Sequence, residues 1–219
     1  MTKQWHKLWI ALTVAIVAVF AGHAMAIEEP AFKTVRSDGD FALRDYDAMI
    51  AAEVRVEGDR NQAINSGFRL IADYIFGNNR QKSKVAMTAP VTQSAASEKI
   101  AMTAPVTQSG EGGAWTVRFI MPARYTMETL PEPNDARVKL VPVPAQRFAV
   151  VRFSGLAGES DIAERTTQLK AWVAAEKLVA EGEVTLARYD PPWTLWFLRR
   201  NELMIPVREA QRNNAAGGQ

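Results

Sequence analysis

One stretch of this chain occurs twice, and the repetition constrains the fold more than any other feature. Residues 84–94 read Lys-Val-Ala-Met-Thr-Ala-Pro-Val-Thr-Gln-Ser, and residues 99–109 read Lys-Ile-Ala-Met-Thr-Ala-Pro-Val-Thr-Gln-Ser. Both copies alternate and are rich in β-branched residues, which is typical of paired strands in a hairpin arm. Pro90 and Pro105 lack an amide donor, so we expect them at strand ends, at bulges or on a sheet edge.

The first half of the chain predicts a strand followed by a helix. From Ala48 to Val56 apolar and polar residues alternate, as in a half-buried strand. Asp59 and Gln62 have the spacing of a helix N-cap, and Gly77 supplies the end of that helix. The apolar residues at helical spacing between them are Ile64, Phe68, Ile71 and Ile75.

The second half repeats this order. Residues 147–153 predict a strand, Ser160 is a candidate cap, and Gly182 is a candidate end for the helix between them. The helix would carry Ile162, Leu169, Trp172 and Val173. Residues 54–58 match residues 151–155 at a constant offset of 97, which favours an internal duplication. Residues 115–121 and 193–200 predict strands that close each half. The expected fold class is α+β, with mostly antiparallel strands and one helix per half.

The first 26 residues predict export. Lys3 and Lys7 precede an uncharged apolar stretch, and Ala24-Met25-Ala26 places small residues where a signal peptidase cleaves. We expect a signal peptide over residues 1–26, a domain over 27–207 and a flexible tail over 208–219. An uncleaved membrane anchor is the alternative, and it would be the protein's only contact with a membrane. The expected location is periplasmic or secreted.

Composition excludes several kinds of site. The chain has 26 basic and 24 acidic residues, and residues 1–26 hold two lysines and no acid, so 24 of each remain. That balance argues against nucleic-acid binding through a basic surface. There is no cysteine, and the two histidines, His6 and His23, both lie in the predicted signal peptide. The processed chain would therefore lack Ser-His-Asp catalysis, zinc sites built from histidine or cysteine, and histidine ligation of haem iron.

Two motifs resemble the SOUL haem-binding family. One is the repeated segment, with a lysine and an aliphatic residue leading into Ala-Met-Thr-Ala-Pro-Val ahead of a strand containing Trp115. The other is Tyr-Asp-Pro-Pro at 189–192 followed by Arg-Arg-Asn-Glu at 199–202. The resemblance spans roughly 27–207 and implies a pseudo-twofold, duplicated and distorted β-barrel flanked by two helices. It also implies binding of haem or another tetrapyrrole. Residues 202–206 resemble the wider group of gyrase-inhibitor-like effector-binding domains.

Six residues are the candidates for the ligand site. The resemblance places haem beside the first helix, where Arg69 and Lys84 could meet propionates. Met87 and Met102 occupy equivalent positions in the two copies, and methionine either fills gaps in a core or lines an apolar pocket. Phe68 lies on the same helix as Arg69. Glu202 is either an exposed strand residue that pairs with Arg199 or Arg200, or a carboxylate inside a cavity.

Three functions remain open from the sequence. The leading one is a tetrapyrrole binder or carrier without catalysis, which holds haem or another planar apolar molecule without histidine, by burial, by cations near the propionates, or by unusual iron ligands such as tyrosine, methionine or lysine. The first alternative is a small-molecule effector binder or hydrolase of the gyrase-inhibitor-like type that uses Glu202. The second is an interaction protein that pairs through the repeated arm at 84–109.

Overall fold

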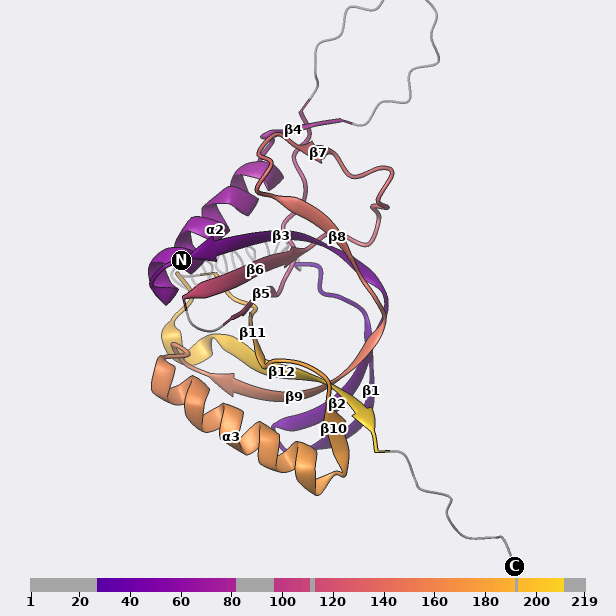
Figure 1. Cartoon of the computed structure of the whole chain (residues 1–219), viewed down its shortest axis with the longest axis vertical. Helices are drawn as coiled ribbons and strands as arrows, with labels where there is room; N and C mark the ends of the chain where they lie inside the picture. The colour runs from indigo at the N-terminus through magenta and orange to yellow at the C-terminus, as the bar shows by residue number, and fades with distance from the viewer. Residues whose placement is uncertain (1–26, 82–96, 111–112, 192, 211–219) are drawn as a thin grey trace, which may run out of the picture.

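A curled antiparallel sheet carries two helices on its outer face (Figure 1). The computed structural model describes residues 27–81, 97–110, 113–191 and 193–210. Along the sheet the strand order is β1-β2-β9-β12-β11-β5-β6-β3-β8, and β10 pairs with β12 beyond this path. The strands are β1 (Phe32–Asp38), β2 (Phe41–Tyr46), β3 (Met49–Glu57), β5 (Val106–Ser109), β6 (Ala114–Ile120), β8 (Lys139–Val143), β9 (Gln146–Ser154), β10 (Leu178–Ala180), β11 (Thr185–Arg188) and β12 (Arg200–Glu209). Two short strands, β4 (Asn79–Arg80) and β7 (Glu132–Pro133), pair separately.

Each helix covers one half of the convex face of the sheet (Figure 1). The α2 helix (Arg60–Ile75) packs on β3 and β6, where Ile71 and Phe119 are fully buried. The α3 helix (Glu159–Ala175) packs on β9 and β12 through Leu169 and Trp172. A helix buries its apolar stripe most effectively against the apolar face of a sheet, so each half has its own core.

The concave face of the sheet is the one that matters for the site. Along β12, Leu203 and Ile205 point to the α3 core, while Met204 belongs to a small separate cluster with Tyr46 and Val150. Successive side chains of a strand point to opposite faces, so Glu202 shares the concave face with Met204. β12 is buried on both faces over residues 201–205, and its concave face borders the hollow of the half-barrel.

The predicted α+β fold is confirmed: two helices flank a curled antiparallel sheet. The predicted helix cap at Asp59 is confirmed, because its carboxylate accepts hydrogen bonds from the amides of Asn61 and Gln62. The predicted strands around 48–56, 115–121 and 147–153 appear as β3, β6 and β9. Pro105 lies directly before β5, as expected for a residue without an amide donor.

Four element boundaries differ from expectation. The cap of α3 is Gly158, and Ser160 lies within the first turn. That helix ends at Ala175 and not near Gly182, because the chain reverses at Lys177 (φ 56°) and forms β10 against β12. The last strand continues through Arg208 and Glu209, so these two residues belong to the sheet and not to a tail. The fourth difference is the expected strand over 193–200.

The segment 193–199 is a loop with a 3₁₀ turn, Trp196–Leu198, and β12 begins only at Arg200. Its neighbour β11 ends at Arg188, opposite Asn201, so none of the strands that the structure describes lies across from residues 193–199. The Asp190 carboxylate accepts a hydrogen bond from the Arg200 amide at 2.6 Å and closes the loop. Without a partner strand, an alternating apolar pattern has no hydrogen-bonding template.

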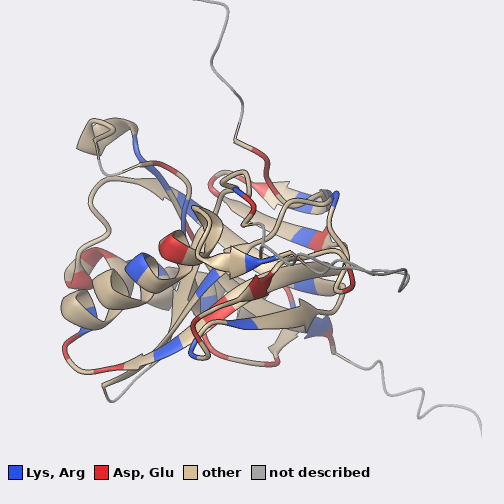
Figure 2. Ribbon diagram, turned by 90° about the horizontal axis from the view of Figure 1, so that it is seen from above, with Lys and Arg blue, Asp and Glu red and all other residues tan. Residues whose placement is uncertain are grey.

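Strands β3 and β9 start 97 residues apart and also end 97 residues apart, and a helix follows each. This agrees with the offset seen in the sequence; the internal duplication itself stays a prediction. Basic and acidic residues are interspersed over the ribbon (Figure 2). In the part of the chain that the structure describes, no helix has the length and apolar character to cross a membrane.

Candidate functional site

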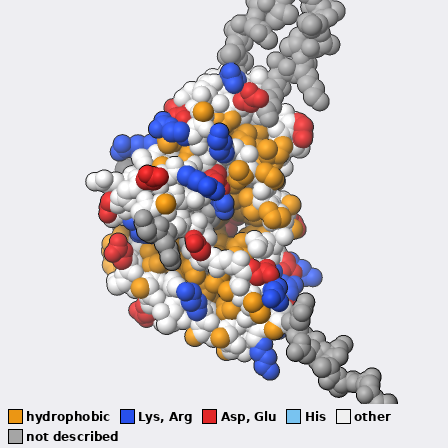
Figure 3. All heavy atoms as spheres, in the orientation of Figure 1, with side chains coloured by type: hydrophobic (Ala, Val, Ile, Leu, Met, Phe, Trp, Pro, Cys, Tyr) orange, Lys and Arg blue, Asp and Glu red, His pale blue; other side chains and the backbone are white. Residues whose placement is uncertain are grey.

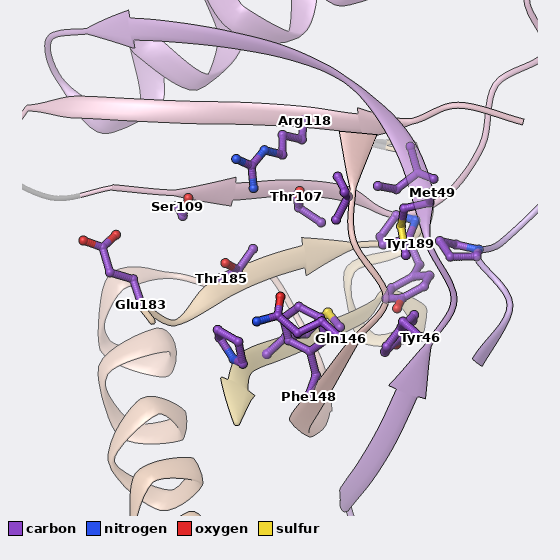
Figure 4. A pocket seen from close by; sticks show the side chains of 16 residues that line it. Tyr46, Met49, Thr107, Ser109, Arg118, Gln146, Phe148, Glu183, Thr185 and Tyr189 are labelled. Atoms are coloured by element: carbon purple, nitrogen blue, oxygen red, sulfur yellow. The ribbon is translucent and has the colours of Figure 1, made fainter. Parts of the chain in front are cut away.

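A cavity of about 350 Å³ lies on the concave face, inside the curl of the sheet (Figure 4). Its walls come from strands that are distant in sequence: Tyr46 on β2, Thr107 on β5, Arg118 on β6, Phe148 on β9 and Thr185 on β11. Its size is at the lower end of the range for small-molecule sites, and such sites combine apolar walls with a few placed polar groups.

The two ends of the cavity differ in chemistry. In Figure 4, Glu183 and Ser109 lie at one end, and the tyrosines Tyr46 and Tyr189 lie with Met49 at the other. The guanidinium of Arg118 projects into the space between them. A planar ligand with an apolar body and an anionic edge would find rings at one end and a cation in the middle.

Arg118 is oriented by a buried carboxylate. Its Nε donates to Glu53 Oε2 at 2.6 Å, and Glu53 is 8% exposed on the neighbouring strand β3. The register places Glu53 directly opposite Arg118, so the pair follows from the strand pairing. A held guanidinium loses less freedom when it binds a ligand carboxylate than a free one does.

The tyrosine end rests on a buried ion pair. Glu202 is 2% exposed, and its Oε2 accepts from Arg44 Nη1 at 2.9 Å and from the Tyr189 hydroxyl at 2.7 Å. Arg44 Nη1 also donates to the Tyr46 hydroxyl at 3.3 Å. The Arg200 guanidinium lies 3.6 Å from the centre of the Tyr189 ring. Glu202 therefore lies behind the cavity lining and fixes the two tyrosines that form it.

The protonation states of this end follow from its burial. Burial raises the pKa of Tyr189, and the adjacent Glu202 charge raises it further, so the phenol stays protonated. Burial also raises the pKa of Tyr46. Burial alone would lower the pKa of Arg44, but Glu202 and Tyr46 outweigh it and the pKa is raised. Neutral phenols make poor iron ligands compared with a phenolate.

A second hollow adjoins the cavity. It measures about 760 Å³ and shares Pro30, Met49, Ile120 and Val143 with the first. Hydrophobic side chains gather along this side of the molecule, around the hollowed part of the face shown (Figure 3). A ligand larger than the cavity can therefore extend along an apolar groove without leaving the protein.

Of the six residues chosen from the sequence, the four that the structure describes do not converge on this cavity. Phe68 is partly exposed on α2 and packs against Phe119, with ring centres 5.2 Å apart, and Arg69 is exposed beside it. Met102 is exposed just before β5. Glu202 meets a cation, but the cation is Arg44 and not Arg199 or Arg200.

Lys84 and Met87 lie outside the described residues, as do the first copy of the repeat and the predicted signal peptide. The second copy is described, and it contributes β5, which is paired on both sides, with β6 and with β11. The cavity and α2 lie on opposite faces of the sheet, so the residues beside α2 and the cavity residues mark two separate positions for a ligand.

Sequence reasoning missed most of the cavity residues. Tyr46, Phe148 and Met204 come from strands whose alternation could have placed them on one face, but the pairing partners were unknown. Tyr189 belongs to the Tyr-Asp-Pro-Pro motif, which in the sequence indicates the family resemblance but no role for the tyrosine itself. Arg118 gave no signal in the sequence, because its role depends on the register between β3 and β6.

The described residues contain no cluster of three or more acidic, histidine or cysteine side chains that could hold a metal ion. The cavity offers two thioethers, Met49 and Met204, and the two protonated tyrosines. This chemistry suits the apolar body of a tetrapyrrole, with Arg118 for a propionate, better than it suits strong ligation of iron.

Comparisons with known proteins agree with this fold. The C-terminal domain of EcmrR superposes with a TM-score of 0.56 at 13% identity, covering 82% of this chain and 99% of that one. A structure described as a hydrolase from Listeria innocua gives a TM-score of 0.50 at 17% identity, covering 77% of this chain and 92% of that one. At these identities the likeness concerns the fold alone.

Sequence comparison gives the family. Human heme-binding protein 2 is 35% identical over 74 residues, which is 32% of this chain and 36% of that protein, so the aligned segment spans about a third of the curated relative. The family model for SOUL heme-binding proteins matches residues 27–206. The match covers most of the chain, and the chain has the two helices and the curled sheet that the family resemblance implied. This chain therefore belongs to the SOUL heme-binding protein family.

Proposed function

We propose that this protein binds haem or a related tetrapyrrole in the concave cavity and acts as a carrier without chemistry of its own. The observation that carries the proposal is the cavity itself: an apolar space with aromatic walls, one oriented cation and an open apolar extension. Membership of the SOUL family supports the ligand class. The macrocycle would lie against Tyr46, Phe148 and Tyr189, with a propionate at Arg118.

Binding would come mainly from burial. Each Å² of apolar surface removed from water contributes about 25 cal/mol before ordering costs, so a macrocycle can bind without an iron ligand. Haem iron, when bound, would supply the redox or ligand-binding chemistry of the group. The residues here would supply shape, exclusion of water and a charge for the propionate.

We therefore expect hemin and iron-free protoporphyrin to bind with affinities within about tenfold of each other, because neither gains strong axial ligation. Titration followed by tryptophan fluorescence and by the Soret band measures both. A broad Soret band is the expected spectrum. Tight hemin binding with no binding of the iron-free ring would show that an axial ligand dominates, and failure of both at micromolar concentration would remove the tetrapyrrole assignment.

The alternative that uses Glu202 as a catalytic or cation-binding group has less support. Glu202 is covered by the cavity lining, and Arg44 already compensates its charge. A cationic effector would have to displace a buried guanidinium. The second alternative is that the repeated arm at 84–109 pairs with another protein. The second copy of the repeat does not favour it, because its strand β5 already has a partner strand on each side.

Export is a separate part of the proposal and rests on residues 1–26, which the structure does not describe. We expect cleavage after Ala26 and a mature chain that begins at Ile27. Intact-mass measurement of the protein from its native host checks this, since the loss of 26 residues is unmistakable. A mass that includes residues 1–26, with the protein in the membrane fraction, would indicate an anchor instead.

A further inference from the structure

The loop between β11 and β12 exposes an unusual set of side chains. Trp193 is 81% exposed and Leu198 is 62% exposed. Between them the exposed apolar residues are Leu195, Trp196 and Phe197. Leu156, in the turn after β9, is also exposed, and the end of β9 contacts the 3₁₀ turn. We call these six side chains the apolar tip. Soluble proteins rarely expose such a group without a partner for it.

Packing within the molecule does not account for the tip. The 3₁₀ turn has no buried residue, and Trp196 meets Phe197 edge-on, with ring centres 5.6 Å apart, without entering either helix core. The loop is nevertheless held in place, because Arg199 Nε donates to the Thr194 carbonyl at 2.8 Å and Asp190 binds the Arg200 amide. The apolar side chains are thus presented outward on a fixed turn.

Cations surround the base of the tip. Arg188 ends β11, and its Nη2 donates to the Ala157 carbonyl at 3.5 Å, beside Leu156. Arg199 lies in the loop itself, where its Nε binds the Thr194 carbonyl. Arg188 is largely buried, and this burial lowers its pKa, as do the nearby charges of Arg60 and Arg199. Within the described residues, neither Arg60 nor Arg188 forms an ion pair.

We propose that the apolar tip docks on an anionic phospholipid bilayer, with its tryptophan, phenylalanine and leucine side chains in the interfacial layer and with Arg60 and Arg199 toward the phosphates. Tryptophan rings with a polar edge favour this layer, and apolar area together with basic residues determines the strength of such binding. The charge around the tip is complementary to an anionic headgroup surface.

A second copy of the chain is a poorer occupant. A stable protein interface uses about 20–30 residues from each side, and the tip offers six apolar side chains. A twofold contact through the tip would also bring the same arginines of both copies together. The position is distinct from the concave cavity, so docking does not depend on the ligand that the cavity binds.

The absence of cysteine provides a direct test. A single cysteine at Leu195→Cys in the full chain accepts a polarity-sensitive fluorophore at the tip alone. The matched control is Ala145→Cys, which is exposed at the opposite end of β9. On adding vesicles of phosphatidylcholine with phosphatidylglycerol, we expect a blue shift at the tip and none at the control position, even if residues 1–26 also bind the vesicles.

Pure phosphatidylcholine vesicles should give a smaller shift. Arg60→Gln in the labelled chain should weaken binding to the anionic vesicles about fivefold, the loss expected for one basic residue at such a surface. The double substitution Trp193→Ser and Leu198→Ser should abolish the shift, and both positions are exposed enough to leave folding intact. An unshifted tip probe would overturn the proposal. So would a shift that appears without vesicles as protein concentration rises, since that would indicate self-association.

Discussion

Replacing Arg44 with methionine should lower the free energy of unfolding by roughly 3–5 kcal/mol, the cost of leaving a buried charge without its partner. Arg44 is the only cation that the structure places against Glu202 within the described residues. The Glu202 side chain is nearly inaccessible to water, and the Arg44 side chain is 13% exposed. The substitution also removes the hydrogen bond to Tyr46 and the stacking of the guanidinium over Phe32. Urea unfolding followed by tryptophan fluorescence measures the loss.

The double variant Arg44→Met with Glu202→Gln is the control. It removes the uncompensated charge, so most of the lost stability should return if charge is the cause. Equal destabilisation of the single and double variants would mean that packing, and not the ion pair, is responsible.

Filling the cavity should remove ligand binding while the fold remains. Thr185 lines the cavity from β11, opposite Met204, and points into the open space (Figure 4). In Thr185→Phe an aromatic ring would occupy volume that the macrocycle needs, so porphyrin affinity should fall by more than about tenfold, or at least ~1.4 kcal/mol. β-Propensity favours phenylalanine in a strand, and unfolding should change little.

Two further variants separate the possible positions of the ligand. Thr34→Phe introduces the same ring on the exposed strand β1, away from the cavity, and should leave porphyrin affinity unchanged. Phe68→Ser changes the exposed face of α2, the position that the family resemblance favoured. If Phe68→Ser abolished binding and Thr185→Phe did not, the ligand would lie beside α2, and the cavity assignment would be wrong.

The architecture was largely readable from local pattern. Alternation predicted β3, β6 and β9, helical spacing predicted α2 and α3, and Asp59 marked a cap that the structure confirms. These features depend on residues a few positions apart, where side-chain periodicity and capping act directly. The errors arose where a distant strand decided the outcome, as at Gly182 and over 193–200.

The site could not be read in the same way. Arg118 meets Glu53 across 65 residues, and Arg44 meets Glu202 across 158. Which residues of two strands face each other depends on register, and a shift of one position moves every side chain to the other face. A sequence shows that Glu202 and Arg44 are charged, but it does not show that one neutralises the other.

The sequence by itself determined the fold class, the two helices, the family and the lack of histidine and cysteine outside residues 1–26. Only the tertiary structure decided that the concave face is hollow, that Tyr46 and Tyr189 form one end of that hollow, and that Glu202 lies behind them. It also turned an expected strand into the exposed apolar tip. The physical reason is that local periodicity fixes an element, whereas a cavity exists only where several elements, distant along the chain, curl around space that their side chains leave unfilled.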